Sequence, residues 1–409
     1  MKKIFTFFTM ATSMFAFGQT ADSVNTGGGA SDVYYDFETK TQYKVDSRSW
    51  DIGLTTDLMD ASILINENAG VELFVYSTDT SNWASIDTAG FAFENVYNSE
   101  DNWAEGAFAN QGTRHPDYGW GIYNMNSHDI AGNRLFIIKT KEGDYLKAVV
   151  DVLTRGGEFT IRTAKLDGSD AKTHVFSKQD RTTTGKNFGF LNIATEQIST
   201  ENPESKMWDL LFARYVTTVM QGPVTQDMAV SGIKINKGCE VAERSGVDVM
   251  SNDTSSLSWN SNITEIGYDW KSFDRGTFRY NMTQDLTYFV RTTNGGVWKI
   301  YFTGYQGGRD GQSNFVTEEI KQGVASSSAV SKLNTKVYPN PASGVVTIAN
   351  SENAPINVSI IDVTGKVVYG SDVLANSELS VDVSAFESGI YFVQMESNST
   401  VTTSRLMVE

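Results

Sequence analysis

The segment LFIIKTKEGDYLKAVV, residues 135–150, holds two apolar runs around the polar turn Lys141-Glu142-Gly143-Asp144. Short runs of this kind on both sides of a glycine-containing turn are typical of a β-hairpin. The segment YFVRTTNGGVWKIYF, residues 288–302, has the same layout around Thr293-Asn294-Gly295-Gly296. Aromatic residues make up 12 % of the chain and there are only six prolines, which also favours strands over helices. We therefore predict an all-β fold.

Two motifs precede these hairpins in the same order. Trp50-Asp51 recurs as Trp208-Asp209, and Tyr123-Asn124-Met125 recurs as Tyr280-Asn281-Met282. The offsets are 158 residues for the first motif, 157 for the second and 152 for the hairpins. Self-similarity in a fixed order indicates an internal repeat. We predict two tandem modules, residues 32–182 and 183–322; the alternative is a chance match between short strand sequences.

Residues 1–31 and 323–335 have the composition of a signal peptide and of flexible segments. Residues 1–18 contain Lys2 and Lys3, an uncharged run from Ile4 to Phe17, and Gly18. This layout is typical of a cleaved signal peptide, and the run is too short for a membrane span. Glycine and serine enrichment predicts a flexible segment over residues 19–31 and an exposed linker over residues 323–335.

Charge and cysteine content restrict the partners. The formal net charge is −16, which argues against nucleic acid and anionic membranes as partners. Cys239 is the single cysteine, so no intramolecular disulfide forms in spite of export. We expect Cys239 to be a small, half-buried strand residue rather than a reactive thiol.

The C-terminal segment consists of three strand-and-turn units. They are Val337-Tyr338-Pro339-Asn340-Pro341, Ile360-Ile361-Asp362-Val363-Thr364-Gly365-Lys366 and Ser388-Gly389-Ile390-Tyr391-Phe392-Val393. The prolines fall outside the strands, where a missing N–H costs no ladder bond. We predict a small antiparallel β-sandwich over residues 336–409.

This segment closely resembles the C-terminal sorting domain, subtype A, of the Bacteroidetes type IX secretion system. The resemblance rests on the motif residues Tyr338, Pro339, Asn340, Pro341, Gly365 and Gly389. It implies recognition by the type IX secretion machinery and passage across the outer membrane. The cargo would then be secreted or attached to the cell surface.

Enzyme signatures are absent from the sequence. The three histidines, His115, His128 and His174, have no second histidine or cysteine at metal-ligand spacing. No nucleophile elbow, phosphate loop or dinucleotide fingerprint occurs, and no pair of the many carboxylates is marked out for glycoside hydrolysis. We predict that the chain is not an enzyme.

The repeated motifs resemble those of the HmuY-like haem-binding family of hemophores. Trp208 to Tyr215 is the better match to that family's W-D strand, and Tyr123 to His128 is the better match to its histidine segment. The resemblance covers most of residues 32–320. It implies an all-β protein that captures haem or a related tetrapyrrole and passes it to an outer-membrane transporter.

Three residues are candidate haem ligands. His128 and Met125 are three residues apart in one loop, and imidazole and thioether are both axial ligands of haem iron. Met282 occupies the corresponding place in the second copy, which has no histidine there. The alternatives are a solvated loop histidine and methionines that fill gaps in the core.

A different class of function is a surface adhesion or glycan-binding protein without haem. Exposed aromatic rings stack on sugars, and the candidates for such a platform are Trp83, Trp103, Trp120 and Tyr118. A tetrapyrrole binder needs an axial ligand in a pocket, whereas a glycan binder needs exposed aromatic rings.

Overall fold

The structure is a computed structural model, and it describes residues 18–84, 86–113, 115–199, 201–221, 224–323, 335–362, 366–397 and 400–409. The chain divides into two compact units, one up to residue 324 and one from residue 325. The predicted signal peptide lies outside the described residues except for Gly18, and so does nearly all of the predicted linker.

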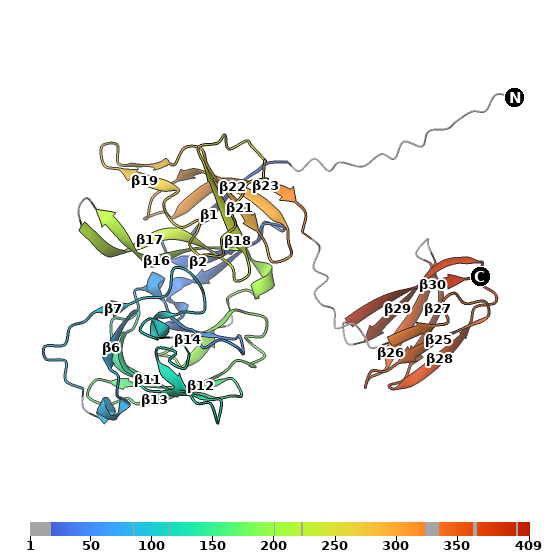
Figure 1. Ribbon diagram of the computed structural model, residues 1–409, viewed down its shortest axis with the longest axis horizontal. Helices are drawn as coiled ribbons and strands as arrows, with labels where there is room; N and C mark the ends of the chain where they lie inside the picture. The colour runs from blue at the N-terminus through green and yellow to red at the C-terminus, as the bar shows by residue number, and fades with distance from the viewer. Residues whose placement is uncertain are drawn as a thin grey trace. The chain divides into compact units, whose positions relative to one another are not determined.

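The all-β prediction is confirmed (Figure 1). The helical segments in the described residues are short 3-10 turns: η1 Ser47–Ser49, η2 Glu67–Ala69, η3 Thr80–Ala84, η4 Ala107–Ala109 and η5 Ser205–Met207. None of them has the length and apolarity that a membrane-spanning helix requires.

One half of the larger unit contains two antiparallel sheets. The first has the order β13-β12-β11-β10-β6-β7; in addition β9 pairs with β11, and β8 pairs with β9. Its strands are β6 Glu72–Ser77, β7 Asn95–Val96, β8 Gly121–Tyr123, β9 Ile130–Gly132, β10 Leu135–Lys139, β11 Tyr145–Leu153, β12 Glu158–Lys165 and β13 Lys172–Ser177. The second has the order β15-β14-β4-β5, with β4 Ile52–Thr55, β5 Ile63–Ile65, β14 Phe188–Asn192 and β15 Gln197–Ser199.

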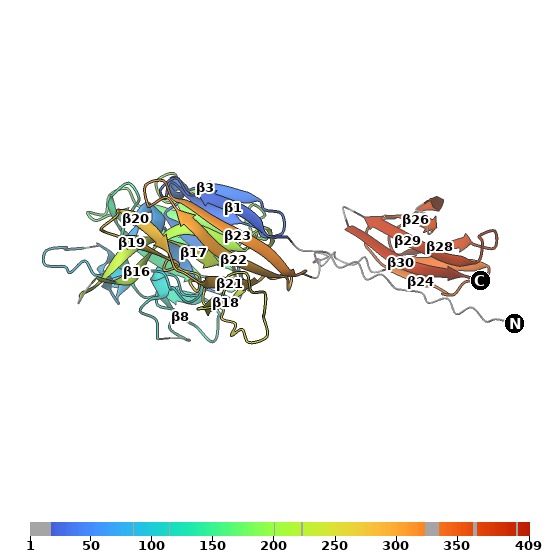
Figure 2. The ribbon, with the colours of Figure 1, turned by 90° about the horizontal axis from the view of Figure 1, so that it is seen from above.

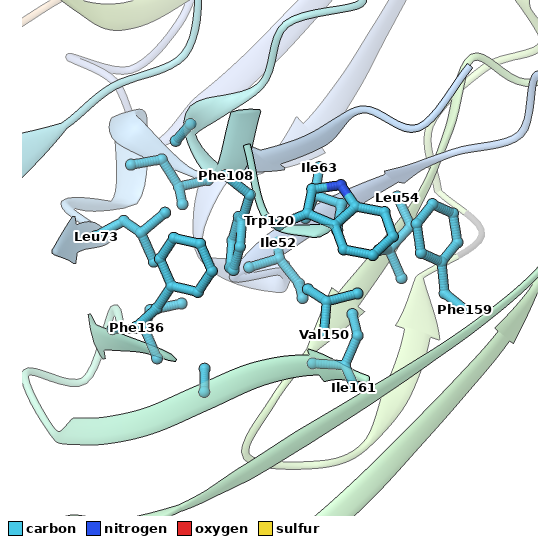
Figure 3. Close-up of a cluster of buried hydrophobic side chains, with 14 of the residues drawn as sticks. Ile52, Leu54, Ile63, Leu73, Phe108, Trp120, Phe136, Val150, Phe159 and Ile161 are labelled. Carbon is cyan, nitrogen blue, oxygen red and sulfur yellow. The ribbon is translucent and has the colours of Figure 1, made fainter. Parts of the chain in front are cut away.

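Both sheets contribute to one hydrophobic core (Figure 3). Ile52 and Leu54 of β4 lie in the same cluster as Val150 of β11 and Ile161 of β12. The fully buried Trp120 ring lies with them, and its indole N–H donates to the carbonyl of Ala61 at 3.0 Å. Burial alternates along β12, as expected for a strand with one face on a core.

The other half has two main sheets whose strand orders correspond to these, but without a counterpart of β7 among the described residues. A five-stranded sheet runs β1-β23-β22-β21-β18, a four-stranded sheet runs β17-β16-β2-β3, and β19 pairs with β20. The strands are β1 Thr20–Asn25, β2 Ser31–Tyr35, β3 Gln42–Asp46, β16 Leu210–Gln221, β17 Val224–Ile235, β18 Glu240–Ser245, β19 Lys271–Asp274, β20 Arg279–Met282, β21 Leu286–Arg291, β22 Val297–Tyr305 and β23 Gln312–Lys321. The two predicted hairpins are therefore β10–β11 and β21–β22.

Several hydrogen bonds around the two Trp-Asp motifs occur in matching pairs. The Asp51 N–H donates to Leu191 and the Asp209 N–H donates to Tyr35, both at 2.8 Å. Further along, the Asn66 side chain donates to the carbonyl of Trp50, as the Asn236 side chain does to Trp208. Trp50 and Trp208 therefore occupy equivalent positions, with the rings buried as expected for core residues.

The same comparison corrects the boundaries of the modules. A cut between residues 182 and 183 separates β13 from β14, although β14 pairs with β4 of the first half. In the second half, β1 pairs with β23 and β2 pairs with β16. Strands β1, β2 and β3 thus take the places that β13, β14 and β15 have in the first half. We call residues 47–199 the first repeat, and residues 205–321 with 20–46 the second repeat.

Two further expectations are corrected by these pairings. The segment 19–31, predicted to be flexible, contains β1 and a turn, because its backbone completes the five-stranded sheet. Figures 1 and 2 show β1 in the same sheet as β23 and β22, and its direct neighbour is β23. Met282 lies in β20, the second strand of its hairpin, whereas Met125 lies in the turn after β8. Met282 is therefore not the counterpart of Met125.

The carboxyl group of Asp209 provides a pH-dependent test of the Trp-Asp network. It is buried, accepts the Phe37 N–H at 2.9 Å, and burial raises its pKa from 3.8 to about 7. The folded chain therefore holds a proton that the unfolded chain has lost, and stability falls as the pH rises from about 4 to 7. In the wild type, this group should lower the free energy of unfolding by on the order of 3 kcal/mol over that pH range, and Asp209→Asn should abolish this contribution. Urea unfolding of the wild type and of Asp209→Asn at pH 5 and pH 8 measures this contribution. If the free energy of unfolding falls equally in the two proteins, the assignment to Asp209 is contradicted.

The C-terminal unit is the predicted antiparallel β-sandwich. One sheet has the order β24-β25-β28 and the other β27-β26-β29-β30. The strands are β24 Thr335–Tyr338, β25 Val345–Asn350, β26 Ile356–Asp362, β27 Val367–Val373, β28 Ser377–Asp382, β29 Gly389–Ser397 and β30 Thr400–Val408. Valine and isoleucine side chains from both sheets form its core.

Candidate functional site

A groove of about 1010 Å³ is lined by residues of both repeats. One wall is the connection between β7 and β8, and the other comes from the β16–β17 hairpin with residues 262 and 264. The Asn262 amide donates to Asp101 at 2.9 Å and the Thr264 hydroxyl donates to Glu100 at 2.8 Å. Side chains therefore tie the two walls together across the repeats.

A buried ion pair holds the end of this groove near β8. Arg134 donates through both terminal nitrogens to Asp117, at 2.9 and 3.0 Å. It also donates to the carbonyls of Gly119 and Gln111. The hydrogen bonds from Arg134 lower the pKa of Asp117 to about 2. This arrangement fixes the loop that carries Tyr118 and His115.

The groove is acidic and contains two tyrosine rings. Carboxylates come from Asp60, Glu100, Asp101, Glu105, Asp117 and Asp227, and amides come from Asn98, Asn110 and Asn262. Among the described lining residues there is no lysine or arginine. Tyr97 and Tyr118 are half-buried, and partial burial raises the pKa of Tyr97. The surface is thus suited to an uncharged or cationic ligand rather than an anion.

The candidate haem ligands are not gathered in a cavity. His128 is exposed in the turn between β8 and β9, and its Nδ1 lies 2.6 Å from the Tyr123 hydroxyl. Met125 lies in the same turn with 68 % of its surface exposed. Met282 packs against the core of the second repeat. The three residues are therefore in two separate places.

The sequence analysis did not predict that His115 lies near Tyr123 and His128. The His115 ring centroid is 5.1 Å from that of Tyr123, whose own ring lies 5.9 Å from that of His128. The structure thus brings two exposed imidazoles into contact with one tyrosine ring. No spacing rule would have found them, because they are 13 positions apart in the chain and a hairpin strand lies between them. The third histidine, His174, is buried and bonded to Thr163 at 2.9 Å.

The four aromatic residues proposed as a platform do not form one. Trp120 is fully buried, and Trp103 donates its indole N–H to the carbonyl of Ile235 at 2.9 Å. The Trp83 ring is covered by Lys147 and Arg162, at 4.9 and 4.7 Å from its centroid. Only Tyr118 faces the groove.

Cys239 is buried rather than half-buried, and burial raises the pKa of its thiol, which agrees with a packing role. Among the described residues, no group of three or more histidine, cysteine, aspartate and glutamate side chains is placed to hold a metal ion.

The sorting-motif residues have structural roles in the C-terminal unit. The Asn340 amide donates to Arg405 at 2.6 Å and its oxygen accepts the Met407 N–H at 2.9 Å, so the motif is fastened to the last strand. Pro339 and Pro341 lie after β24, outside the strands, and the Tyr338 hydroxyl donates to Glu378 at 2.8 Å. Gly389 begins β29, and Gly365 lies outside the described residues.

Comparison with known proteins identifies the C-terminal unit. Residues 336–409 match the model of the secretion system C-terminal sorting domain. One solved structure, described as a biofilm associated protein, BSP domain, matches with 10 % identity and a TM-score of 0.17. The match covers 96 % of this chain and 66 % of that chain, slightly less than two thirds of its length. No curated protein matches the chain.

The sorting domain indicates a protein that interacts with the type IX secretion machinery and is secreted or attached to the cell surface.

Proposed function

We propose that this secreted or surface-attached chain is a non-catalytic binding protein whose acidic groove binds an uncharged glycan. The groove carries the proposal, because it offers two tyrosine rings among carboxylates and amides. Tyrosine rings stack on the apolar faces of sugars, while carboxylates and amides bond to hydroxyl groups in fixed directions. A volume of about 1010 Å³ is large enough for several sugar rings.

Substitution of Tyr97 tests this function. We expect Tyr97→Ala to weaken binding of a neutral oligosaccharide by about 10- to 100-fold, because it removes a stacking surface worth roughly 1–3 kcal/mol. The measurement is a glycan-array screen with the wild-type chain, followed by calorimetric titration with the best neutral hit. Phe93→Ala is the matched control, since Phe93 is 44 % exposed and does not line the groove.

Salt dependence separates a glycan from a cationic polymer. An uncharged glycan should keep its affinity between 50 mM and 500 mM salt, whereas binding of a basic peptide by these carboxylates would fall steeply. A wild-type chain that binds no neutral glycan but binds polylysine in a salt-sensitive manner would contradict the proposal.

Haem capture of the HmuY type is a second candidate, favoured by the two imidazoles of His115 and His128, which both lie next to the Tyr123 ring. The donor atoms fit haem iron. The surroundings fit the rest of the cofactor poorly, because the turn is exposed and His115 lines an acidic groove that would repel the propionates. Transfer of haem to an outer-membrane transporter would be a further step of this candidate.

Absorbance near 400 nm after mixing the protein with haemin tests this candidate directly. A Soret band that disappears in both His128→Ala and His115→Ala would establish haem binding at this turn. A band that survives in a His128→Ala, Met125→Ala variant would eliminate those ligands, and the absence of any band would leave the glycan proposal as the sole candidate.

A further inference from the structure

The β19–β20 hairpin carries a row of aromatic rings that runs from its tip towards β22. Phe278 is 80 % exposed and Phe273 is 48 % exposed. The ring centroids of Phe278 and Phe273 are 6.4 Å apart, and that of Phe273 is 5.1 Å from that of Tyr280, its partner across the two strands. The row continues at 4.8 Å to Tyr305 of β22. Neighbouring large apolar rings in solvent mark a binding surface more often than single exposed residues do.

Folding of the hairpin does not require the Phe278 ring. Phe278 is the last residue of the turn between the two strands, and its φ is 54°. Glycine and asparagine adopt this left-handed conformation most readily, whereas a bulky side chain is strained there. The turn is held by Asp274, whose carboxylate accepts the Gly276 N–H and the Thr277 hydroxyl, both at 2.8 Å. The chain thus places a bulky ring on a fixed tip at a cost in stability, as expected of a binding residue rather than of a turn residue.

The exposed charge of this hairpin is positive, although the whole chain has a formal net charge of −16. Arg275 and Arg279 lie three residues before and one residue after Phe278, and both are exposed. Neither guanidinium group forms a hydrogen bond or an ion pair with another described residue. Asp274 is the one carboxylate of residues 271–282, and it is engaged in the turn. Charge complementarity therefore favours an anionic partner.

We propose that this hairpin binds a polysaccharide of uronic acids, whose sugar rings stack on the two phenylalanines and whose carboxylates pair with the two arginines. Aromatic rings supply flat apolar surfaces for the faces of sugars, and guanidinium groups bind carboxylates through two parallel hydrogen bonds. A membrane of anionic lipid fits less well, because its extended surface would also meet the net charge of −16 on the rest of the chain. A single polysaccharide chain contacts the hairpin alone.

This site is separate from the acidic groove and does not depend on the proposed glycan binding. No residue of the hairpin is among the described residues that line the groove, and the groove repels the carboxylates that the hairpin attracts. The two sites thus take ligands of different charge, and either can fail its test while the other passes.

Calorimetric titration of the full chain with an oligomer of galacturonic acid at about 50 mM salt tests the proposal. We expect Phe278→Asn to weaken binding by about 10- to 100-fold, while the free energy of unfolding does not fall, because asparagine suits the turn. Arg275→Gln and Arg279→Gln should each weaken binding by about tenfold, and Arg279→Lys should not restore it, because an ammonium group makes no bidentate pair. The matched controls are Val175→Ala, at a 57 % exposed apolar position, and Arg155→Gln, at an exposed arginine in another turn; neither should change the affinity.

Two matched probes separate the sugar rings from their charge. The methyl ester of the same oligomer keeps the rings without the carboxylates, so it should bind at least about tenfold more weakly and be insensitive to Arg279→Gln. Polyglutamate keeps the carboxylates without sugar rings, so its binding should not respond to Phe278→Asn. The proposal is overturned if the wild type does not bind the galacturonic acid oligomer, or if Phe278→Asn binds it as tightly as the wild type does. Phe278-dependent binding of anionic lipid vesicles, without binding of the oligomer, would assign the hairpin to a membrane instead.

Discussion

A chain that lacks residues 19–46 is expected to lose the fold of the second repeat. These residues form β1, β2 and β3, and they bury Val24, Val33, Tyr35 and Phe37 completely in its core. Burying one large apolar side chain contributes about 1.5–3 kcal/mol, so losing four removes about as much free energy as a whole domain retains. The deletion also leaves β16 and β23 with unpaired edges. Near-ultraviolet circular dichroism and urea unfolding would show the loss.

A rearranged chain should recover the fold. It starts at residue 47, carries residues 19–46 after residue 322, and ends with residues 323–409. Thr20 lies opposite Thr317 in the sheet, so a short connector suffices, and the six residues 166–171 that join β12 to β13 provide a model for it. We expect the free energy of unfolding of the rearranged chain to lie within about 1 kcal/mol of that of the parent, because the strand pairings are kept. If the rearranged chain is as unfolded as the chain that lacks residues 19–46, then β1, β2 and β3 do not take the places of β13, β14 and β15.

After removal of residues 336–409, the protein is expected to be retained in the periplasm, while the cargo, the unit up to residue 324, stays folded. The removed segment is the sorting domain, and the chain up to residue 324 is a compact unit of its own. Cell fractionation should show surface or culture-medium protein falling to background, while the melting temperature of the truncated cargo stays within about 2 °C of the same unit in the full chain.

Two controls make this result specific. Fusion of residues 323–409 to an unrelated periplasmic protein should carry that protein to the surface. Asn340→Ala, which removes two hydrogen bonds to the last strand, should reduce export, whereas Val345→Ala at a 52 % exposed position should not. Surface display of the truncated cargo would contradict the sorting assignment.

The strands, the hairpins and the C-terminal domain could be predicted from local sequence signals. Alternating apolar residues and glycine turns are local signals, so β10–β11 and β21–β22 lie where the pattern put them. Gly143 and Gly295 supply the positive φ, 93° and 82°, that their turns require. The sorting domain was recognisable because its motif residues are close together in the chain.

The assembly of the repeats and the recesses between them could not be predicted, because both depend on contacts between distant segments. The partner of β16 is β2, well over a hundred residues earlier, and no local pattern encodes a pairing at that separation. For the same reason sequence reasoning put the module boundary between β13 and β14 and missed the placement of His115 beside Tyr123. Tertiary packing also determines which side chains are buried in a core and which line a recess. Trp120 fills a core, while Tyr97 and Lys234 line recesses that exist only where the two repeats meet. A cavity is formed by side chains from distant segments, so its chemistry appears only after the chain has folded.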